Sequence, residues 1–205
     1  DTIRLRVWND PKSPDGRPYG AGNNDLDATI EMGKRITDAG LGVLVNFHYS
    51  DFWADPGKQF KPKAWENLSF DKKTDAIYEY TKDSLEKLQN AGISIGMVQI
   101  GNETNGAMCG VFSSELGGWA KITDMMSAGA KAVREVCPKA LIAVHFANPE
   151  KVTNYASYSA NLDYYGVDYD VFASSYYPFW HGTLDNLAEV LSDVAEKYNK
   201  KVMVA

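Results

Sequence analysis

The sequence has no long apolar run and no basic cluster, and these absences bear on its partners. Its longest apolar runs, around residues 41–45 and 140–147, fall well short of the roughly 20 residues that span a bilayer. Its 21 Lys and Arg against 27 Asp and Glu give a formal net charge of −6, which disfavours binding to a phosphate backbone. It also lacks GxGxxG and GxxxxGK[ST] motifs, which weakens a nucleotide-binding interpretation. We therefore expect neither nucleic acid nor a membrane as a partner.

Cysteine is scarce, with Cys109 and Cys137 alone in 205 residues. The first lies just after an expected strand, and the second lies at the far end of the helix that follows. A helix of ~18 residues spans about 27 Å, whereas a disulfide needs Cα atoms within about 7 Å. We predict two free thiols, whose state gives no indication of the cellular compartment.

What the chain does contain is a strict alternation of strand and helix patterns. Apolar residues make up 44% of it, which is enough for a buried core. Strands are expected at residues 2–8, 42–48, 95–102, 140–146, 170–176 and 201–205, and helices at 24–39, 70–91, 114–136, 151–162 and 185–198. Alternation of this kind predicts a parallel sheet with helices outside it, in the α/β class.

A doubly wound sheet and a (β/α)₈ TIM barrel both fit this order. Strands follow one another at intervals of about 30–50 residues, so eight strand–helix units at this spacing would need more than the ~250 residues of a typical barrel. If the fold is a barrel, this chain therefore lacks about two of the eight units. The chain also opens within a strand and closes within one, at Lys200–Ala205. We expect residues 1–205 to form a single partial catalytic domain that is truncated at both ends.

Polar and aromatic residues gather where the expected strands end. In a parallel sheet these carboxyl ends share one rim, which is where barrels perform chemistry. The residues at these ends are Arg6, Trp8 and Asn9; Asn46, His48 and Tyr49; Asn102, Glu103 and Asn105; His145 and Asn148; and Tyr176, Tyr177 and Trp180. The pattern recurs on five strands, which makes it a stronger indication of a site than any single residue.

The sharpest motif is Gln99-Ile100-Gly101-Asn102-Glu103. A carboxyl group at a strand end, preceded by an amide, suits a glycosidase general acid/base, because the amide can bind a sugar hydroxyl while the acid protonates the glycosidic oxygen. A retaining reaction needs a second carboxylate about 5–5.5 Å away. Asp10, Asp51 and Asp55 lie in loops and are less well seated, so we expect this second group beyond the last residue, Ala205.

Four segments together resemble the endo-β-1,4-galactanases of glycoside hydrolase family 53, across essentially the whole chain. They are IRLRVWNDP (3–11), VNFHYSDFWADPGKQFKPKAW (45–65), MVQIGNETNGAMCG (97–110) and DVFASSYYPFWHGTL (170–184). The resemblance implies a clan A (β/α)₈ barrel, of which this chain would cover about strands 2 to 7. It also implies retaining hydrolysis of β-1,4-galactan, the side chains of pectin.

The resemblance assigns Glu103 as acid/base and places the nucleophile in a run like VMVAET. Here the chain reads Val202-Met203-Val204-Ala205, so the nucleophilic Glu would be the next residue. A calcium ion occurs in some bacterial members after strand 7, in a segment outside this chain. We therefore assign no cofactor and no metal to these residues.

Matched rim positions imply further substrate-binding roles. Arg6 and His48 would orient the nucleophile and the −1 sugar, and Asn102 would contact the 2-hydroxyl of that sugar. Tyr176 would hydrogen-bond the nucleophile, and His145 would support this network. Three tryptophans would stack on sugar rings: Trp53, Trp65 and Trp180. Simpler structural readings stand beside these: Tyr176 could be packing and Trp65 could be loop core. Arg6 could instead form an ion pair at the bottom of the barrel, but Arg4 fits that role better. The two side chains lie on the same face of the strand, so only their different depth in the barrel can give them different roles.

The family implies a secreted protein acting on a polysaccharide, and we expect a monomer. No signal peptide is present in this chain. Two alternatives remain at the level of sequence. One is another clan A endo-β-1,4-glycanase that cuts mannan, xylan or glucan, and the other is a catalytically silent barrel that binds glycans.

Overall fold

The structure is a computed structural model that describes residues 1–20 and 23–205. Its elements are β1 (Thr2–Val7), α1 (Leu26–Asp38), β2 (Gly42–Phe47), α2 (Phe70–Asn90), β3 (Ile95–Ile100), β4 (Ala107–Met108), β5 (Val111–Phe112), α3 (Gly118–Val136), β6 (Leu141–Phe146), α4 (Val152–Tyr164), β7 (Val171–Ser174), α5 (Leu184–Tyr198) and β8 (Lys201–Val204), with a 3₁₀ turn at Lys63–Trp65. Each long strand and helix lies where the sequence predicts one. The β4–β5 hairpin and the 3₁₀ turn were not expected.

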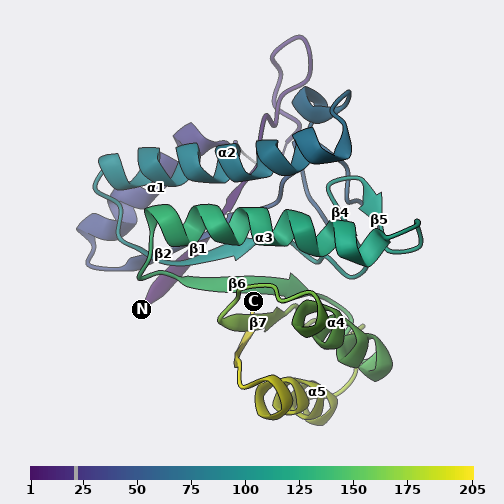
Figure 1. Cartoon of the computed structure of the whole chain (residues 1–205). Coiled ribbons are helices and arrows are strands. Elements are labelled where there is room, and N and C mark those ends of the chain that lie inside the picture. Colours follow the sequence, from purple (N-terminus) through teal and green to yellow (C-terminus); the bar gives the residue numbers. More distant parts are fainter. Residues whose placement is uncertain (21–22) are drawn as a thin grey trace.

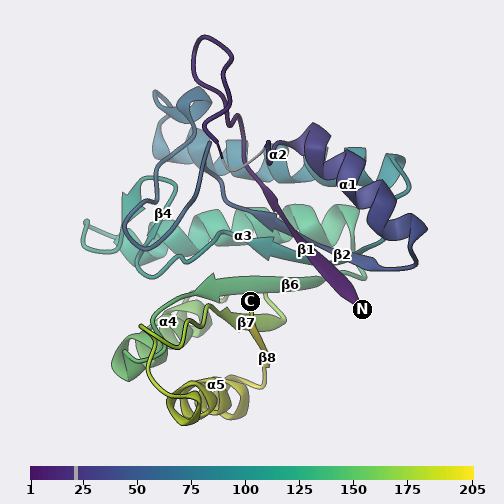
Figure 2. The same ribbon diagram turned by 180° about the vertical axis from the view of Figure 1, so that it is seen from behind.

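Six strands form one parallel sheet in the order β1-β2-β3-β6-β7-β8, which is the order of the chain. Helices α2 and α3 lie in front of the sheet in Figure 1, and β1 lies in front of α3 when the molecule is seen from behind in Figure 2. The helices therefore cover one face of a curved sheet. This confirms the α/β class, and the arrangement is that of an incomplete (β/α)₈ barrel.

The two faces of the sheet carry different side chains. Those directed toward the helices are apolar and fully buried: Val45, Phe47, Val98, Ile100, Ile142, Val144, Phe146 and Phe172. Side chains on the opposite face include Arg4, Asn46 and Gln99, with Asn46 paired in register with Gln99. Since side chains alternate along a strand, a single register sends the apolar set to the core and the polar set to the barrel interior.

Most helix ends follow the capping signals of the sequence. The side chains of Asp25, Ser69 and Thr183 cap α1, α2 and α5, and Gly40 follows α1 in the left-handed conformation. Helix α3 begins at Gly118, four residues later than expected. The preceding residues turn through Gly117 at φ 69°, and a Cβ at Gly118 would lie 2.3 Å from the carbonyl oxygen of Phe112.

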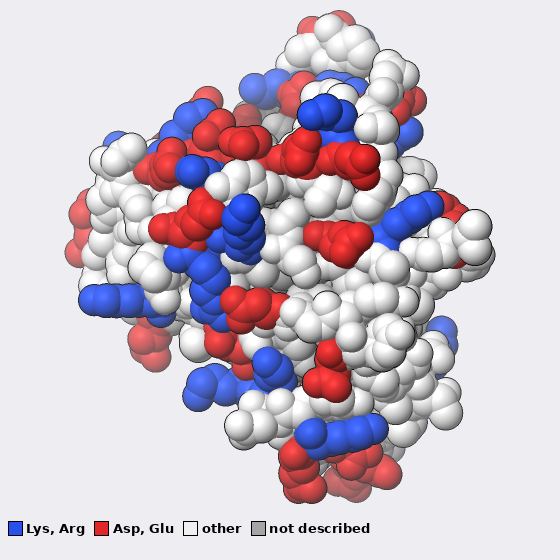
Figure 3. Space-filling view, viewed as in Figure 1, with Lys and Arg blue, Asp and Glu red and all other residues white. Residues whose placement is uncertain are grey.

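The outer surface is mixed in charge. Figure 3, in the view of Figure 1, shows acidic and basic side chains interspersed over the helical face. Within residues 1–20 and 23–205, the helices are all too short or too polar to cross a membrane. Both cysteines are buried and free, which confirms the prediction of two thiols.

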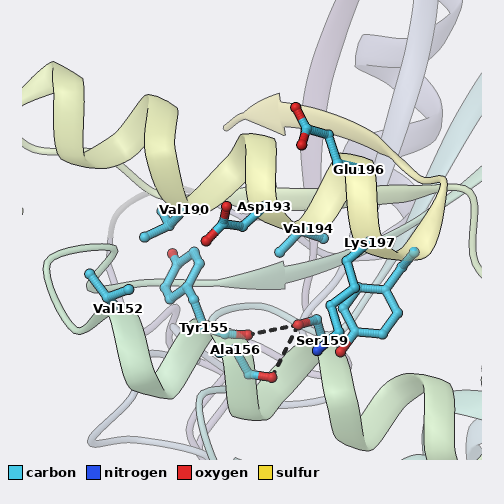
Figure 4. A pocket seen from close by; sticks show the side chains of 10 residues that line it. Val152, Tyr155, Ala156, Ser159, Val190, Asp193, Val194, Glu196 and Lys197 are labelled. Atoms are coloured by element: carbon cyan, nitrogen blue, oxygen red, sulfur yellow. Dashed lines mark hydrogen bonds between the residues drawn. The ribbon is translucent and has the colours of Figure 1, made fainter.

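A groove of about 500 Å³ lies between α4 and α5, on the helical layer (Figure 4). Tyr155 and Ser159 line it from α4, and Val190 and Val194 line it from α5. None of the strand-end residues singled out by the sequence contributes to it. A second hollow, also about 500 Å³, lies among the loops at the rim, and its lining includes Tyr19, Phe52, Phe60 and Phe112.

Candidate active site

Glu103 lies just beyond the end of β3, on a sharply turned backbone. Gly101 has φ 85°, and a Cβ there would meet Thr104 Cγ2 at 2.8 Å. Glu103 itself has φ 49°, a left-handed conformation that is uncommon for a residue with a side chain and that clusters at functional sites. The turn ends β3 two residues earlier than expected and redirects the side chains of Asn102 and Glu103.

Neighbouring segments hold this turn in place. The backbone N–H of Thr104 donates to the carbonyl oxygen of His145 at 2.9 Å. Asn105 accepts from the N–H of Ala147 at 2.7 Å and donates to its carbonyl at 2.8 Å, which fastens the turn to the end of β6. From the loop after β2, the buried amide of Gln59 donates to the carbonyls of Asn102 and Glu103 at 2.8 and 3.2 Å.

The Glu103 carboxyl group is partly buried, and its Oε1 accepts a hydrogen bond from Ser175 Oγ at 2.6 Å. Burial raises its pKa above the ordinary value, while the Ser175 hydrogen bond opposes that rise. Asp55 also raises this pKa, and His181 and Arg4 lower it. A carboxyl group that keeps its proton above its ordinary pKa can act as a general acid.

The amide of Asn102 is fixed in orientation. Its Nδ2 donates to the carbonyl of Ala54 at 2.8 Å. Its Oδ1 accepts from Arg4 Nη2 at 2.9 Å, from Asn46 Nδ2 at 3.2 Å and from Gln99 Nε2 at 3.3 Å. These contacts hold the side chain beside Glu103, where a bound ligand would meet an amide of one defined orientation.

Arg4 belongs to this network, so its interpretation as a barrel-bottom ion pair is wrong. In addition to its bond to Asn102, it donates from Nε to Gln99 Oε1 at 3.0 Å. Its partners are two neutral amides, which its long side chain reaches across β2. The guanidinium of Arg6 lies instead 4.3 Å from the ring centroid of Trp53, in a cation–π contact.

His48 and His145 are both buried and neutral. His48 Nδ1 accepts from the N–H of Ala54 at 3.0 Å, and burial, followed by Arg4 and Arg6, lowers its pKa to about 3. Burial also holds the pKa of His145 well below its ordinary value. His145 Nε2 lies 3.0 Å from Ser175 Oγ, so this ring reaches Glu103 through one hydroxyl.

The aromatic residues divide into three groups. Trp53 packs at the site against Arg6 and, edge-on, against His48. Trp180 is 72% exposed beside Tyr177, so its indole is open to a ligand. Trp65 is only 7% exposed and packs on Tyr80, so it cannot stack on a sugar ring. The alternative interpretation, in which Trp65 belongs to the core under its loop, is the one that fits.

The contact expected between Tyr176 and the nucleophile stays a prediction, because the expected nucleophile is not among these residues. The Tyr176 hydroxyl donates to the carbonyl of Gly182 at 3.0 Å, in the loop before α5. Strand β7 ends at Ser174, and the alternation from Ala173 directs Ser175 into the barrel interior. Ser175 therefore lies beside the acid, a position for which the sequence interpretation had named no residue of this strand.

Sequence reasoning missed Arg4, Gln59 and Ser175. Ser175 could have been found by counting alternate residues from a register position, but Gln59 lies in a long loop with no periodic pattern. In the described part of the chain, His, Cys, Asp and Glu side chains form no group of three or more that could hold a metal ion.

A parallel barrel sheet with an Asn-Glu pair at its carboxyl rim is typical of glycoside hydrolases. The model of glycosyl hydrolase family 53 matches residues 1–205, and the chain belongs to this family.

Known relatives agree with this membership. The chain is 54% identical over 203 residues to an endo-beta-1,4-galactanase of Bacillus subtilis, covering 99% of this chain and 46% of that protein. It is 34% identical to an arabinogalactan endo-beta-1,4-galactanase of Thermothelomyces thermophilus, covering 100% of this chain and 61% of that protein. The chain thus spans about half the length of these relatives.

A solved structure of the same family has the same fold. The GH53 catalytic domain of Ignisphaera aggregans superposes with a TM-score of 0.94 at 40% identity, covering 100% of this chain and 56% of that one. A psychrophilic family 10 endo-beta-1,4-xylanase superposes with a TM-score of 0.62 at 11% identity, covering 94% of this chain and 60% of that one. The second likeness concerns the fold alone.

Proposed function

We propose that this chain forms the acid/base part of a retaining endo-β-1,4-galactanase, with Glu103 as the acid/base. The observation that carries the proposal is the position of the Glu103 carboxyl group at the rim of the sheet, where burial raises its pKa. The names of the relatives support galactan as the substrate.

In the proposed reaction, a second carboxylate attacks the anomeric carbon while Glu103 protonates the departing glycosidic oxygen. Glu103 then takes a proton from water, and that water releases the glycosyl enzyme. We assign the second carboxylate to a Glu directly after Ala205. The N–H of Ala205 donates to the carbonyl of Ser174 at 2.9 Å, which brings that end of β8 beside Ser175 and hence close to Glu103.

The surrounding residues take binding roles in this proposal. Asn102 would contact the sugar hydroxyl next to the cleaved bond, and Arg6 and His48 would orient the sugar and the nucleophile. His145 would act through Ser175. Trp53 and Trp180 would stack on sugar rings. The aromatic hollow at the rim offers room for further units of a polymer.

The proposed partner is a polysaccharide, the (arabino)galactan of pectin, and the proposed site of action is outside the cell, because such a polymer does not cross a membrane. We further propose that the enzyme acts as a monomer.

The test is reducing-end release from linear β-1,4-galactan by the full-length protein, with mannan, xylan and cellulose in parallel. The substitution Glu103→Gln removes the proton donor and should lower galactan cleavage by about 10²–10⁴-fold. Glu189→Gln makes the same chemical change on the exposed face of α5 and should leave the rate unchanged.

Each other outcome has a defined meaning. Near-normal cleavage by the Glu103→Gln variant would exclude Glu103 as the acid. Cleavage of another glycan would keep the mechanism and change the specificity. Glycan binding without cleavage of any polymer would make this a binding protein on a hydrolase scaffold.

A further inference from the structure

Ser175 links two buried groups at the rim of the sheet. It follows β7 directly, is 2% exposed, and its Oγ lies 2.6 Å from Glu103 Oε1 and 3.0 Å from His145 Nε2. A hydroxyl has one proton to donate, so it can donate to only one of these neighbours. Which neighbour receives the proton depends on the tautomer of His145.

The surroundings of the other ring nitrogen decide that tautomer. His145 Nδ1 lies 3.2 Å from the backbone N–H of Glu103 and 3.1 Å from Asn102 Oδ1. The N–H is a fixed donor, whereas Asn102 Oδ1 already accepts from three other donors, one of them the charged Arg4. Nδ1 is therefore the acceptor, and the proton of the neutral ring lies on Nε2.

This fixes the direction of the whole chain of hydrogen bonds. His145 Nε2–H donates to Ser175 Oγ, and the Ser175 hydroxyl donates to Glu103 Oε1. Oε1 is thereby committed as an acceptor in both protonation states of the carboxyl group. The exchangeable proton is left for Oε2.

We propose that Ser175 is a positioning residue that holds Glu103 Oε1 as a permanent acceptor, so that Oε2 alone delivers and receives the catalytic proton. The part of this inference that concerns catalysis rests on the proposed function, whereas the hydrogen-bond direction does not.

The charged and titratable groups that act on Glu103 come from several elements, including Tyr155 on α4. The others are Arg4 on β1, Asp55 in the loop after β2, His145 on β6 and His181 in the loop after β7. Burial raises the pKa of Glu103, and the Ser175 hydroxyl opposes this rise because it donates to the charged form. Removing that hydroxyl leaves the ionised carboxylate without this donor, so the pKa should rise further.

The test compares Ser175→Ala with Ser174→Ala in the full-length protein. Ser174 is an equally buried serine on the opposite face of the strand, and its Oγ lies 2.6 Å from the Tyr155 hydroxyl. Both variants lose one buried hydroxyl, but only Ser175→Ala changes the contacts of Glu103. Ser175→Thr, which keeps the hydroxyl, serves as the rescue variant.

Two readouts are expected to move together in Ser175→Ala. The basic limb of the kcat/KM pH profile, where the acid loses its proton, should shift upward by about one pH unit. The ¹³C carboxyl resonance of Glu103, assigned by its absence in Glu103→Gln, should titrate at a pH higher by the same amount. Ser174→Ala and Ser175→Thr should titrate as the parent protein does.

An unshifted resonance in Ser175→Ala, or an equal shift in Ser174→Ala, would overturn the inference. If Ser175→Ala does not fold, Ser175→Cys, whose thiol is a weak donor, takes its place with the same expected direction. The resonance requires no substrate. A shifted resonance in a protein that cleaves no galactan would therefore contradict the proposed function and leave the hydrogen-bond assignment standing.

Discussion

The guanidinium of Arg4 donates from Nη2 to Oδ1 of Asn102 at 2.9 Å, across 98 positions of sequence. It thereby connects the first strand of the sheet to the residue that precedes the proposed acid. The pKa of Arg4 is lowered chiefly by burial, followed by the repulsion of Arg6, with Glu103 among the groups that oppose this. This hydrogen bond therefore both holds β1 in place and orients the side chain of Asn102 at the site.

Arg4→Lys should therefore reduce kcat/KM on galactan by about 10-fold or more. The guanidinium of arginine is planar and donates to the side chains of Gln99 and Asn102 at once, whereas the ammonium of lysine is a point charge that cannot match both acceptors. Asn102 would therefore lose its fixed orientation. Steady-state kinetics on linear galactan would measure this. Arg17→Lys is the matched control, because the Arg17 side chain is 84% exposed. A normal rate in Arg4→Lys would remove Arg4 from the catalytic network.

Gln59 offers a test of the loop that supports the Glu103 turn. Gln59→Leu leaves the carbonyls of Asn102 and Glu103 without this donor in a buried setting. We expect about 1–3 kcal/mol of destabilisation together with a loss of activity. Gln89→Leu is the control, because Gln89 also donates to a backbone carbonyl but is exposed on α2. Chemical denaturation and galactan assays would check both effects, and equal effects of the two substitutions would contradict the role given to Gln59.

Stability should fall as the protein is acidified from pH 7 toward pH 5. The folded protein keeps His48 neutral, with a pKa of about 3, whereas the unfolded chain protonates it near the ordinary 6.5. His145 behaves in the same direction. Between these pKa values the unfolded state binds more protons, so the free energy of unfolding decreases by on the order of 1 kcal/mol per pH unit for each histidine.

The measurement for this prediction is urea unfolding at several values between pH 5 and pH 7. His48→Asn keeps an acceptor for the N–H of Ala54 but does not titrate there, so its stability should depend less on pH. An unchanged slope in this variant would show that His48 is not buried in its neutral form.

Trp180 and Trp65 should behave in opposite ways. Trp180→Ala removes an exposed ring at the rim, so KM for galactan should rise by about tenfold with little change in melting temperature. Trp65→Ala opens a cavity in the core and should cost about 3–5 kcal/mol of stability. Thermal melts and saturation kinetics on both variants would distinguish these effects. A large loss of stability in Trp180→Ala would contradict its exposure.

The order of strands and helices was predictable because both depend on local periodicity. The apolar runs at 42–48 and 140–146 indicate strands buried beneath helices, and Gly40 marks a helix end. The position of Glu103 just beyond a strand end was predictable because its motif lies within a few residues of sequence. Periodicity and short motifs do not depend on contacts between distant segments.

The site residues that sequence could not provide depend on such contacts. Alternation places Arg4 and Arg6 on one face, but the packing of side chains across β2 decides which of them meets Asn102. The end of β7 decides that Ser175 lies beside Glu103. The burial of Trp65 depends on how a long loop folds over α2, which no local pattern records.

The two buried thiols make this chain a convenient starting point for site-specific labelling. Burial raises the pKa of Cys109 to about 12 and that of Cys137 to about 11, so both remain as poorly reactive thiols at neutral pH. A cysteine introduced at the 96% exposed Leu116, near the start of α3, would then be the thiol that a maleimide dye attacks first. A fluorophore placed there could report on the rim loops without first replacing either native cysteine.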